Sequence, residues 1–246
     1  MSIATSATQD LNALEQVLSA RRVLFVGAHP DDPDAFAAGT VARLTDAGAQ
    51  VRYVVATSGD KGVPNGEPDP FRFIALREDE QRRSAAYLGV EEVIFLRHRD
   101  GEVYDTQELR GQIVREIRRL KADLVITHDP LTRNLRQHPD HRAVGFATLA
   151  AVFPACRLET YFPEHAADGL EPHIVHMLLL GGGEPNLWID ISDTFQRKIE
   201  ALRLHETQFG QRDWDDMLER WRKRAADSGA PAGLTYAESF AFAYLD

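Results

Sequence analysis

Residues 23–32 read VLFVGAHPDD, and the expected fold follows from this segment. Its first part, Val23 to Ala28, is a short continuous apolar run, which is typical of a strand buried on both faces of a parallel sheet. The polar residues His29 to Asp32 follow directly, and Ala35 to Ala47 then has the character of a helix that Gly48 ends. The stretch therefore predicts a strand, a polar turn and a helix.

Strands and helices alternate in the same way through the rest of the chain. Expected strands cover 51–57, 93–96, 123–127, 174–180 and 187–191, and expected helices cover 71–88, a stretch that Thr106 caps, 140–152, 194–207 and 213–226. The tail beyond residue 191 is expected to be helical. Such alternation indicates a parallel sheet with helices on both faces and right-handed crossovers. We therefore expect a Rossmann-like α/β fold with a mostly parallel sheet.

The length of the chain indicates one domain. The chain has 246 residues, 43% of them hydrophobic, and single hydrophobic cores stop growing only near roughly 250 to 300 residues. The sequence shows no repeat, low-complexity segment or linker. We expect residues 1–246 to form a single domain.

The net charge of the chain limits which classes of partner it can bind. The formal net charge is -10, from 28 Lys and Arg against 38 Asp and Glu. Because nucleic-acid binding depends on clustered basic side chains, this balance argues against nucleic acid as a partner, and it disfavours a membrane surface. No run of about 18 apolar residues is present to span a bilayer, and the first residues have neither the basic nor the apolar region of a signal peptide. We expect a cytoplasmic protein.

Two polar motifs follow the first and fourth expected strands, His29-Pro30-Asp31-Asp32 and, across a loop, His138-Pro139-Asp140-His141. In the usual order of such sheets these strands are neighbours, and ligands bind at their carboxyl ends, so the two motifs should face each other. Cys156 is the only cysteine, so a metal site must use His and carboxylates. Two imidazoles and one carboxylate suit catalytic zinc, which keeps one position open to water. The alternative for each motif alone is a polar turn that caps the next helix.

The sequence resembles the PIG-L/LmbE-like family of metal-dependent N-acetylglucosaminyl deacetylases over nearly its whole length. The resemblance is carried by Ala28-His29-Pro30-Asp31-Asp32, Thr57-x-Gly59-x-x-Gly62, Arg77-x-x-Glu80, Leu88-Gly89-Val90, Thr127-His128-Asp129-Pro130, His138-Pro139-Asp140-His141, Asp190-Ile191-Ser192, Lys198 and His205-x-x-Gln208. The chain departs from the family pattern at Pro33, where members usually have Glu. That position is not a ligand in the family, so the departure affects only the surroundings of the site and the substrate subclass.

The resemblance implies a role for each residue of the two motifs. It implies His29, Asp32 and His141 as metal ligands, Asp31 as general base, and His138 as the group that stabilises or protonates the intermediate. Asp140 is expected to orient a neighbouring imidazole. The implied activity is zinc-dependent removal of an N-acetyl or related N-acyl group from an amino-sugar derivative, by a chain that self-associates into a homo-oligomer.

One zinc ion per chain is expected, with other divalent metals as possible substitutes, because the sequence offers three ligands and no second set. This favours the deacetylase over a phosphoesterase, which commonly uses two metals. A nucleotide-binding fold would need a glycine-rich fingerprint after the first strand, and Gly27-Ala28-His29 is not one. Another metal-dependent hydrolase and a non-catalytic metal-binding protein remain the alternatives.

Two further residues are candidates for binding substrate. Arg77 lies in the helix that follows the second strand's loop, where its guanidinium can reach a sugar hydroxyl or carboxylate; an ion pair with Glu80 at helical spacing is the equal alternative. Asp129 follows the fourth strand and either contacts substrate or caps a turn. Neighbouring His128 is near enough to line the site, but a structural role is the simpler interpretation.

Overall fold

The computed structural model describes residues 10–63 and 69–245. Its strands are β1 (Arg22–Gly27), β2 (Gln50–Thr57), β3 (Glu92–His98), β4 (Leu124–His128), β5 (Met177–Gly181), β6 (Leu187–Asp190) and β7 (Ala237–Tyr244). Its α-helices are α1 (Leu11–Leu18), α2 (Asp32–Asp46), α3 (Pro70–Tyr87), α4 (Gln107–Leu120), α5 (Pro139–Val152), α6 (Phe195–Arg203), α7 (Glu206–Phe209) and α8 (Trp214–Gly229).

The strands form one seven-stranded sheet in the order β3-β2-β1-β4-β5-β7-β6. The neighbours from β3 to β5 are parallel, whereas β7 runs antiparallel to both β5 and β6. The expected mostly parallel α/β fold is thus confirmed, and β1 and β4 are neighbours as the usual order predicts. Their carboxyl ends lie at one edge of the sheet.

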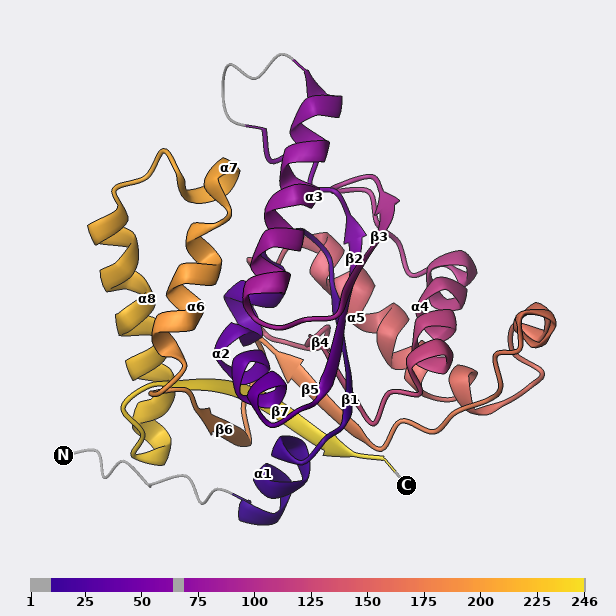
Figure 1. Cartoon of the computed structure of the whole chain (residues 1–246). Coiled ribbons are helices and arrows are strands. Elements are labelled where there is room, and N and C mark those ends of the chain that lie inside the picture. The colour runs from indigo at the N-terminus through magenta and orange to yellow at the C-terminus, as the bar shows by residue number, and fades with distance from the viewer. Residues whose placement is uncertain (1–9, 64–68, 246) are drawn as a thin grey trace.

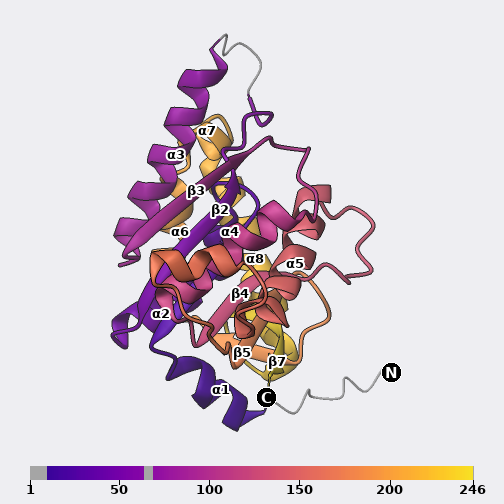
Figure 2. The ribbon, with the colours of Figure 1, turned by 90° about the vertical axis from the view of Figure 1, so that its right-hand side faces the viewer.

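Helices cover both faces of this sheet, as Figures 1 and 2 show from two directions. On one face α1, α2, α3, α6, α7 and α8 pack around Val23 and Phe25 of β1, and on the other α4 and α5 pack around Leu24 and Val26. Successive side chains of a strand point to opposite faces. This is why β1 has a continuous apolar run rather than an alternating one.

Several expected boundaries were wrong. The tail is not wholly helical, because Ala237–Tyr244 forms β7, and the expected helix 194–207 is two helices, α6 and α7, that meet at His205. The expected strand 174–180 begins only at Met177, and α1 was not expected. The helix of the second motif begins at Pro139, one residue before the expected start, because proline is favoured at the first helical position.

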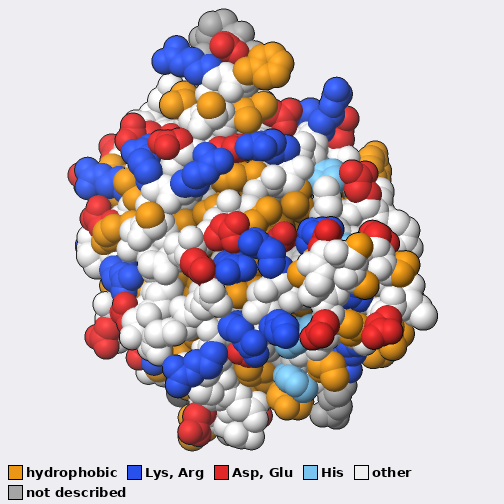
Figure 3. Space-filling view, turned by 45° about the vertical axis from the view of Figure 1, so that its right-hand side comes forward, with side chains coloured by type: hydrophobic (Ala, Val, Ile, Leu, Met, Phe, Trp, Pro, Cys, Tyr) orange, Lys and Arg blue, Asp and Glu red, His pale blue; other side chains and the backbone are white. Residues whose placement is uncertain are grey.

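Charges of both signs are mixed on the face that carries α4 (Figure 3). Ion pairs such as Arg110 with Asp105 and Arg115 with Asp168 bring basic and acidic side chains together there. This face therefore lacks the one-signed basic stripe of a nucleic-acid-binding surface. Among the described residues, no helix is both long and apolar enough to cross a bilayer.

Candidate active site

The first motif forms a tight turn between β1 and α2. Oδ2 of Asp32 accepts hydrogen bonds from the N–H groups of Ala28 (2.9 Å) and His29 (2.8 Å), which folds the chain back on itself. Asp31 takes a left-handed conformation with φ of 93°, which costs a non-glycine residue about 1–3 kcal/mol and is typical of functional sites. Its N–H donates to Oε1 of Gln81 on α3 (2.8 Å), so tertiary contacts hold the turn in this conformation.

Three side chains of the two motifs meet with spacings that suit a metal ion. Nδ1 of His29 lies 3.2 Å from Nε2 of His141, which lies 3.2 Å from Oδ1 of Asp32. Nδ1 of His29 and Oδ2 of Asp32 are 3.5 Å apart. Donors about 2.0–2.1 Å from a tetrahedral zinc ion are separated by about 3.4 Å. The three residues thus form one preformed face of a tetrahedral site.

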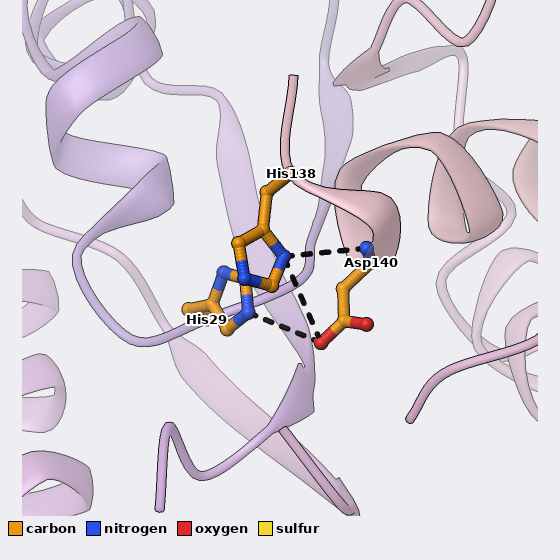
Figure 4. Close-up of side chains that lie close together, drawn as sticks. All are labelled: His29, His138 and Asp140. Atoms are coloured by element: carbon orange, nitrogen blue, oxygen red, sulfur yellow. Dashed lines mark hydrogen bonds and ion pairs between the residues drawn. The ribbon is translucent and has the colours of Figure 1, made fainter. Parts of the chain in front are cut away.

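Two carboxylates contact the opposite nitrogen of His29. Nε2 lies 3.2 Å from Oδ2 of Asp140 and 3.2 Å from Oδ1 of Asp100 (the contact with Asp140 is drawn in Figure 4). The N–H groups of Gly101 (2.6 Å) and Val103 (3.2 Å) in turn fix Asp140. A carboxylate on the far nitrogen sets the tautomer of a ligating imidazole and raises its basicity. This is the orienting position expected of Asp140.

His29, His138 and Asp140 form an alternative group of possible metal ligands that the sequence analysis did not consider. This group shares His29 with the first. It uses Nε2, the nitrogen that already contacts two carboxylates, whereas Nδ1 faces His141 and Asp32. The arrangement therefore favours a ligand set on the Nδ1 side and a supporting hydrogen bond on the Nε2 side.

His138 lies beside the three-residue cluster. It caps α5, since its Nδ1 accepts a hydrogen bond from the N–H of Asp140 (3.3 Å; Figure 4). Its ring meets that of His29 edge to face at 4.6 Å between centroids, and 43% of its side chain is exposed. Partial burial and the charge of His29 lower its pKa. His138 therefore borders the cluster with access to solvent.

The cluster carries an excess of negative charge that a cation would neutralise. Asp31, Asp32, Asp100 and Asp140 surround the imidazoles. Burial alone would lower the pKa of His29, but hydrogen bonds to Asp100, Asp140 and Asp32 raise it to about 12. Burial would raise the pKa of Asp32, yet the nearby imidazoles hold it well below its usual value. A site that stabilises a proton this strongly between carboxylates is suited to a metal cation.

Asp31 stands next to the cluster with 21% of its side chain exposed. Burial raises the pKa of this carboxyl, and the charge of Arg77, whose Nη2 lies 3.4 Å from Oδ1 of Asp31, partly offsets the effect. A carboxylate with a raised pKa that faces solvent beside a metal site is a candidate general base.

Arg77 is buried and connects two loops. It donates to the carbonyl groups of Pro30 (2.5 Å) and Gly59 (3.1 Å). Gly59 has a φ of +64°, and a Cβ there would lie 1.9 Å from Nη1 of Arg77, which explains the glycine. The alternative ion pair with Glu80 is not found in the described part of the chain; Glu80 instead accepts hydrogen bonds from Thr207.

The residues at the end of β4 support the cluster. The His128 ring stacks on that of His141 at 4.0 Å, and its Nε2 lies 3.2 Å from Oδ2 of Asp32. Burial, together with the charge of His141, lowers the pKa of His128 to about 4, so its ring is neutral at pH 7. Asp129 caps a turn through its Oδ1, which accepts from the N–H of Leu131 (2.8 Å).

A buried polar network lies beneath the first motif. Oδ2 of Asp34 contacts Nε2 of His205 (2.6 Å), Nε2 of Gln81 (3.0 Å) and Oγ of Ser84 (2.8 Å). Gln81 then reaches the N–H of Asp31. The sequence analysis missed Gln81, Asp34 and Asp100 as parts of the site. Of these three residues, only Asp100 could have been found from the sequence, because it follows β3 at the carboxyl end of the strands, where ligands bind.

Comparison with known proteins identifies relatives across the whole fold. Residues 24–152 match the PIG-L family, described as GlcNAc-PI de-N-acetylase. Diacetylchitobiose deacetylase of Thermococcus kodakarensis is 34% identical over 234 residues, which are 95% of this chain and 87% of that protein. A probable N-acetyl-alpha-D-glucosaminyl L-malate deacetylase 2 of Bacillus anthracis is 32% identical over 77% of this chain and 82% of its own. The solved structure of N,N'-diacetylchitobiose deacetylase from Pyrococcus horikoshii, in complex with an inhibitor, is 30% identical, has a TM-score of 0.88, and is matched over 95% of this chain and 87% of that one.

Proposed function

Because the chain belongs to the PIG-L/LmbE-like family of de-N-acetylases and is a hydrolase of amide carbon–nitrogen bonds, we propose that it removes an N-acetyl group from an amino-sugar derivative with the help of one zinc ion. The named substrates of its relatives, diacetylchitobiose and an N-acetylglucosaminyl malate, support this substrate class. A related N-acyl group is a second possible target.

One observation carries the proposal: one nitrogen of His29, one nitrogen of His141 and the two carboxylate oxygens of Asp32 lie 3.2 to 3.5 Å apart across the three side chains, next to a partly exposed carboxylate, Asp31, that is not one of them. His29, Asp32 and His141 would hold the ion. Zinc bound there would lower the pKa of a bound water to about 7 and polarise the amide carbonyl. The same donors would accept another divalent metal in place of zinc.

The remaining residues would move protons and fix geometry. Asp31 would accept the proton of the attacking water, since its carboxylate is partly exposed and lies near enough to Asp32 and His29 for their charges to shift its pKa. With Nδ1 of His138 accepting the N–H of Asp140, its Nε2–H would donate a hydrogen bond to the oxyanion that forms from the carbonyl. Either residue would then return a proton to the leaving amine. Asp140 would keep His29 in the tautomer whose Nδ1 is free to bind metal.

We assign Arg77 and Asp129 to the border of the substrate site. The buried position of Arg77 and its 3.4 Å contact with Asp31 support a role that acts through the catalytic turn. Asp129 would contribute from the carboxyl end of β4. We also propose that residues 1–246 act as a single domain, for which the continuous sheet is the support, and that the chain forms a homo-oligomer.

An assay of the zinc-loaded protein tests the proposed function. N,N'-diacetylchitobiose, a simple N-acetylglucosaminide and a phosphoester would be offered in parallel, with released amine, acetate and phosphate as the readouts. We expect deacetylation that Asp31→Asn removes, and no phosphate release. Phosphate release that depends on Asp31, with every amide left intact, would assign the protein to another class of metal-dependent hydrolase.

A further inference from the structure

A pocket lies near the proposed reaction centre, between α2, α6, α8 and β7. Its volume is about 170 Å³, and its walls include Phe36, Gly183, Lys198, Trp221, Arg224 and Glu238. An apolar cavity of about 150 Å³ holds a benzene molecule, so this pocket has room for a group about the size of one ring. The proposed mechanism uses none of these six residues.

Two contacts connect this pocket to the metal-ligand cluster. The Phe36 ring lies 5.9 Å from the His141 ring, and the guanidinium carbon of Arg224 lies 5.9 Å from the same Phe36 ring. Gly183, in the pocket wall, lies against Asp129, because a Cβ on that glycine would be 1.7 Å from Oδ2 of Asp129. The Phe36 side chain thus separates the cluster from the pocket by the thickness of one ring, and Gly183 lies close to the carboxyl end of β4.

The acidic and lysine side chains of the pocket are already paired. Nζ of Lys198 lies 2.5 Å from Oε1 of Glu238, and both side chains are buried. The same carboxylate accepts hydrogen bonds from the N–H groups of Gly39 (3.0 Å) and Thr40 (2.7 Å). Both oxygens of Glu238 are thus engaged by Lys198 and by backbone N–H groups, and Glu238 acts on Arg224 only through its charge, without a hydrogen bond.

Arg224 has no ion pair with any described residue. Its guanidinium lies over the rings of Trp221 (5.3 Å) and Phe36 (5.9 Å). Contacts through the faces of a guanidinium leave its N–H edge free, and that edge fits the two oxygens of a carboxylate. Since Arg224 and Lys198 both lie over the Trp221 ring, stacking of a neutral sugar on this ring is disfavoured.

We propose that this pocket binds a carboxylate on the amine-bearing part of the substrate and that Arg224 recognises it. An acetyl group is too short to reach past Phe36, so the anionic group must belong to the rest of the substrate. The proposal rests on the proposed deacetylase function and adds that, among N-acetyl amino sugars, the protein prefers those with an acidic substituent.

The test compares two glycosides that differ in one group. Carboxymethyl and carbamoylmethyl N-acetylglucosaminide have nearly the same shape, but only the first is charged. We expect the protein to prefer the carboxylate in kcat/KM by roughly 10- to 100-fold, the worth of a hydrogen bond to a charged group. Arg224→Gln should remove most of this preference, and raised salt should reduce it. Arg222→Gln changes another exposed arginine of the same helix that does not line the pocket, so it is the matched control and should keep the preference.

A binding measurement separates this proposal from the proposed function. Titration calorimetry with the two corresponding glucosaminides, the deacetylated forms, reports on the pocket even if neither glycoside is hydrolysed. Tighter binding of the carboxylate that Arg224→Gln abolishes supports the pocket in either case. Equal affinities for the two compounds, or a preference that Arg224→Gln leaves intact, would overturn it.

Discussion

The two polar motifs share the sequence His-Pro-Asp, yet the corresponding residues have opposite environments. In the first motif the histidine, His29, is buried and belongs to the metal-ligand cluster, while Asp31 is partly exposed. In the second, 43% of the His138 side chain is exposed, while Asp140 is fully buried and contacts His29. The same residue types are thus proposed to serve as ligand and base in the first motif, and as solvent-exposed histidine and orienting carboxylate in the second.

The difference arises from where each helix begins. In the first motif the chain turns through a left-handed residue, Asp31, before α2 begins at Asp32, so Asp32 rather than Asp31 faces the cluster. In the second, α5 begins directly at Pro139, so Asp140 and His141 both lie in the first helical turn and face inward. Backbone geometry, rather than the motif alone, decides which side chain binds.

Loss of a ligand should have the largest effect. His29→Ala should lose both the metal and activity, because it removes a donor and leaves the carboxylates behind it without their partner. Metal analysis and acetate release check this. If His29→Ala kept its metal, the three-residue cluster would not be the binding site.

Loss of the base should come next. Asp31→Asn should keep its metal while kcat falls by roughly the 10²–10⁴ typical of a general acid-base group. Because the working form is the carboxylate and burial raises its pKa, the activity of the unaltered protein should decline as pH falls through that raised pKa. The variant should lack this acid limb in kcat/KM against pH. A metal-free Asp31→Asn protein would instead make Asp31 a ligand.

Loss of the orienting carboxylate should be milder. Asp140→Asn keeps the shape of the side chain but weakens its support of Nε2 of His29, so metal affinity should fall by about 10- to 100-fold. Competition with a zinc chelator measures this. Asp105→Asn, on an exposed ion pair, is a suitable control. Unchanged metal affinity in Asp140→Asn would show that Asp140 does not support metal binding through His29.

Loss of the Gln81 hydrogen bonds beneath the first motif should have the smallest effect. Gln81→Leu leaves the N–H of Asp31 and the Asp34 carboxylate each short of one partner. Buried groups left unsatisfied cost about 1–3 kcal/mol, and chemical denaturation should show a loss of stability in this range. Asp31 should also relax its strained backbone, so kcat should fall more than metal content. Equal loss of both would indicate a general structural role.

The sequence was sufficient for the mostly parallel sheet, for the neighbouring first and fourth strands and for the positions of both motifs, because apolar runs and strand ends leave local signals. It was insufficient for predicting site residues whose role depends on contacts between elements that are distant in the sequence. Gln81 and Asp34 contribute single polar side chains whose role depends on how α3 packs against α2, and no spacing encodes that. The left-handed Asp31 and strand β7 were missed for the same reason: the surrounding structure stabilises conformations that the local sequence does not require.

The metal content of His141→Ala and His138→Ala, measured side by side, tests the contrast between ligand and neighbour most directly. The two histidines are three residues apart, but only His141 lies within 3.2 Å of both His29 and Asp32. The account predicts that His138→Ala retains about one metal ion per chain, as expected of a mononuclear site, while His141→Ala retains almost none. Comparable metal loss in the two variants would contradict it and would move the ion toward the group formed by His29, His138 and Asp140.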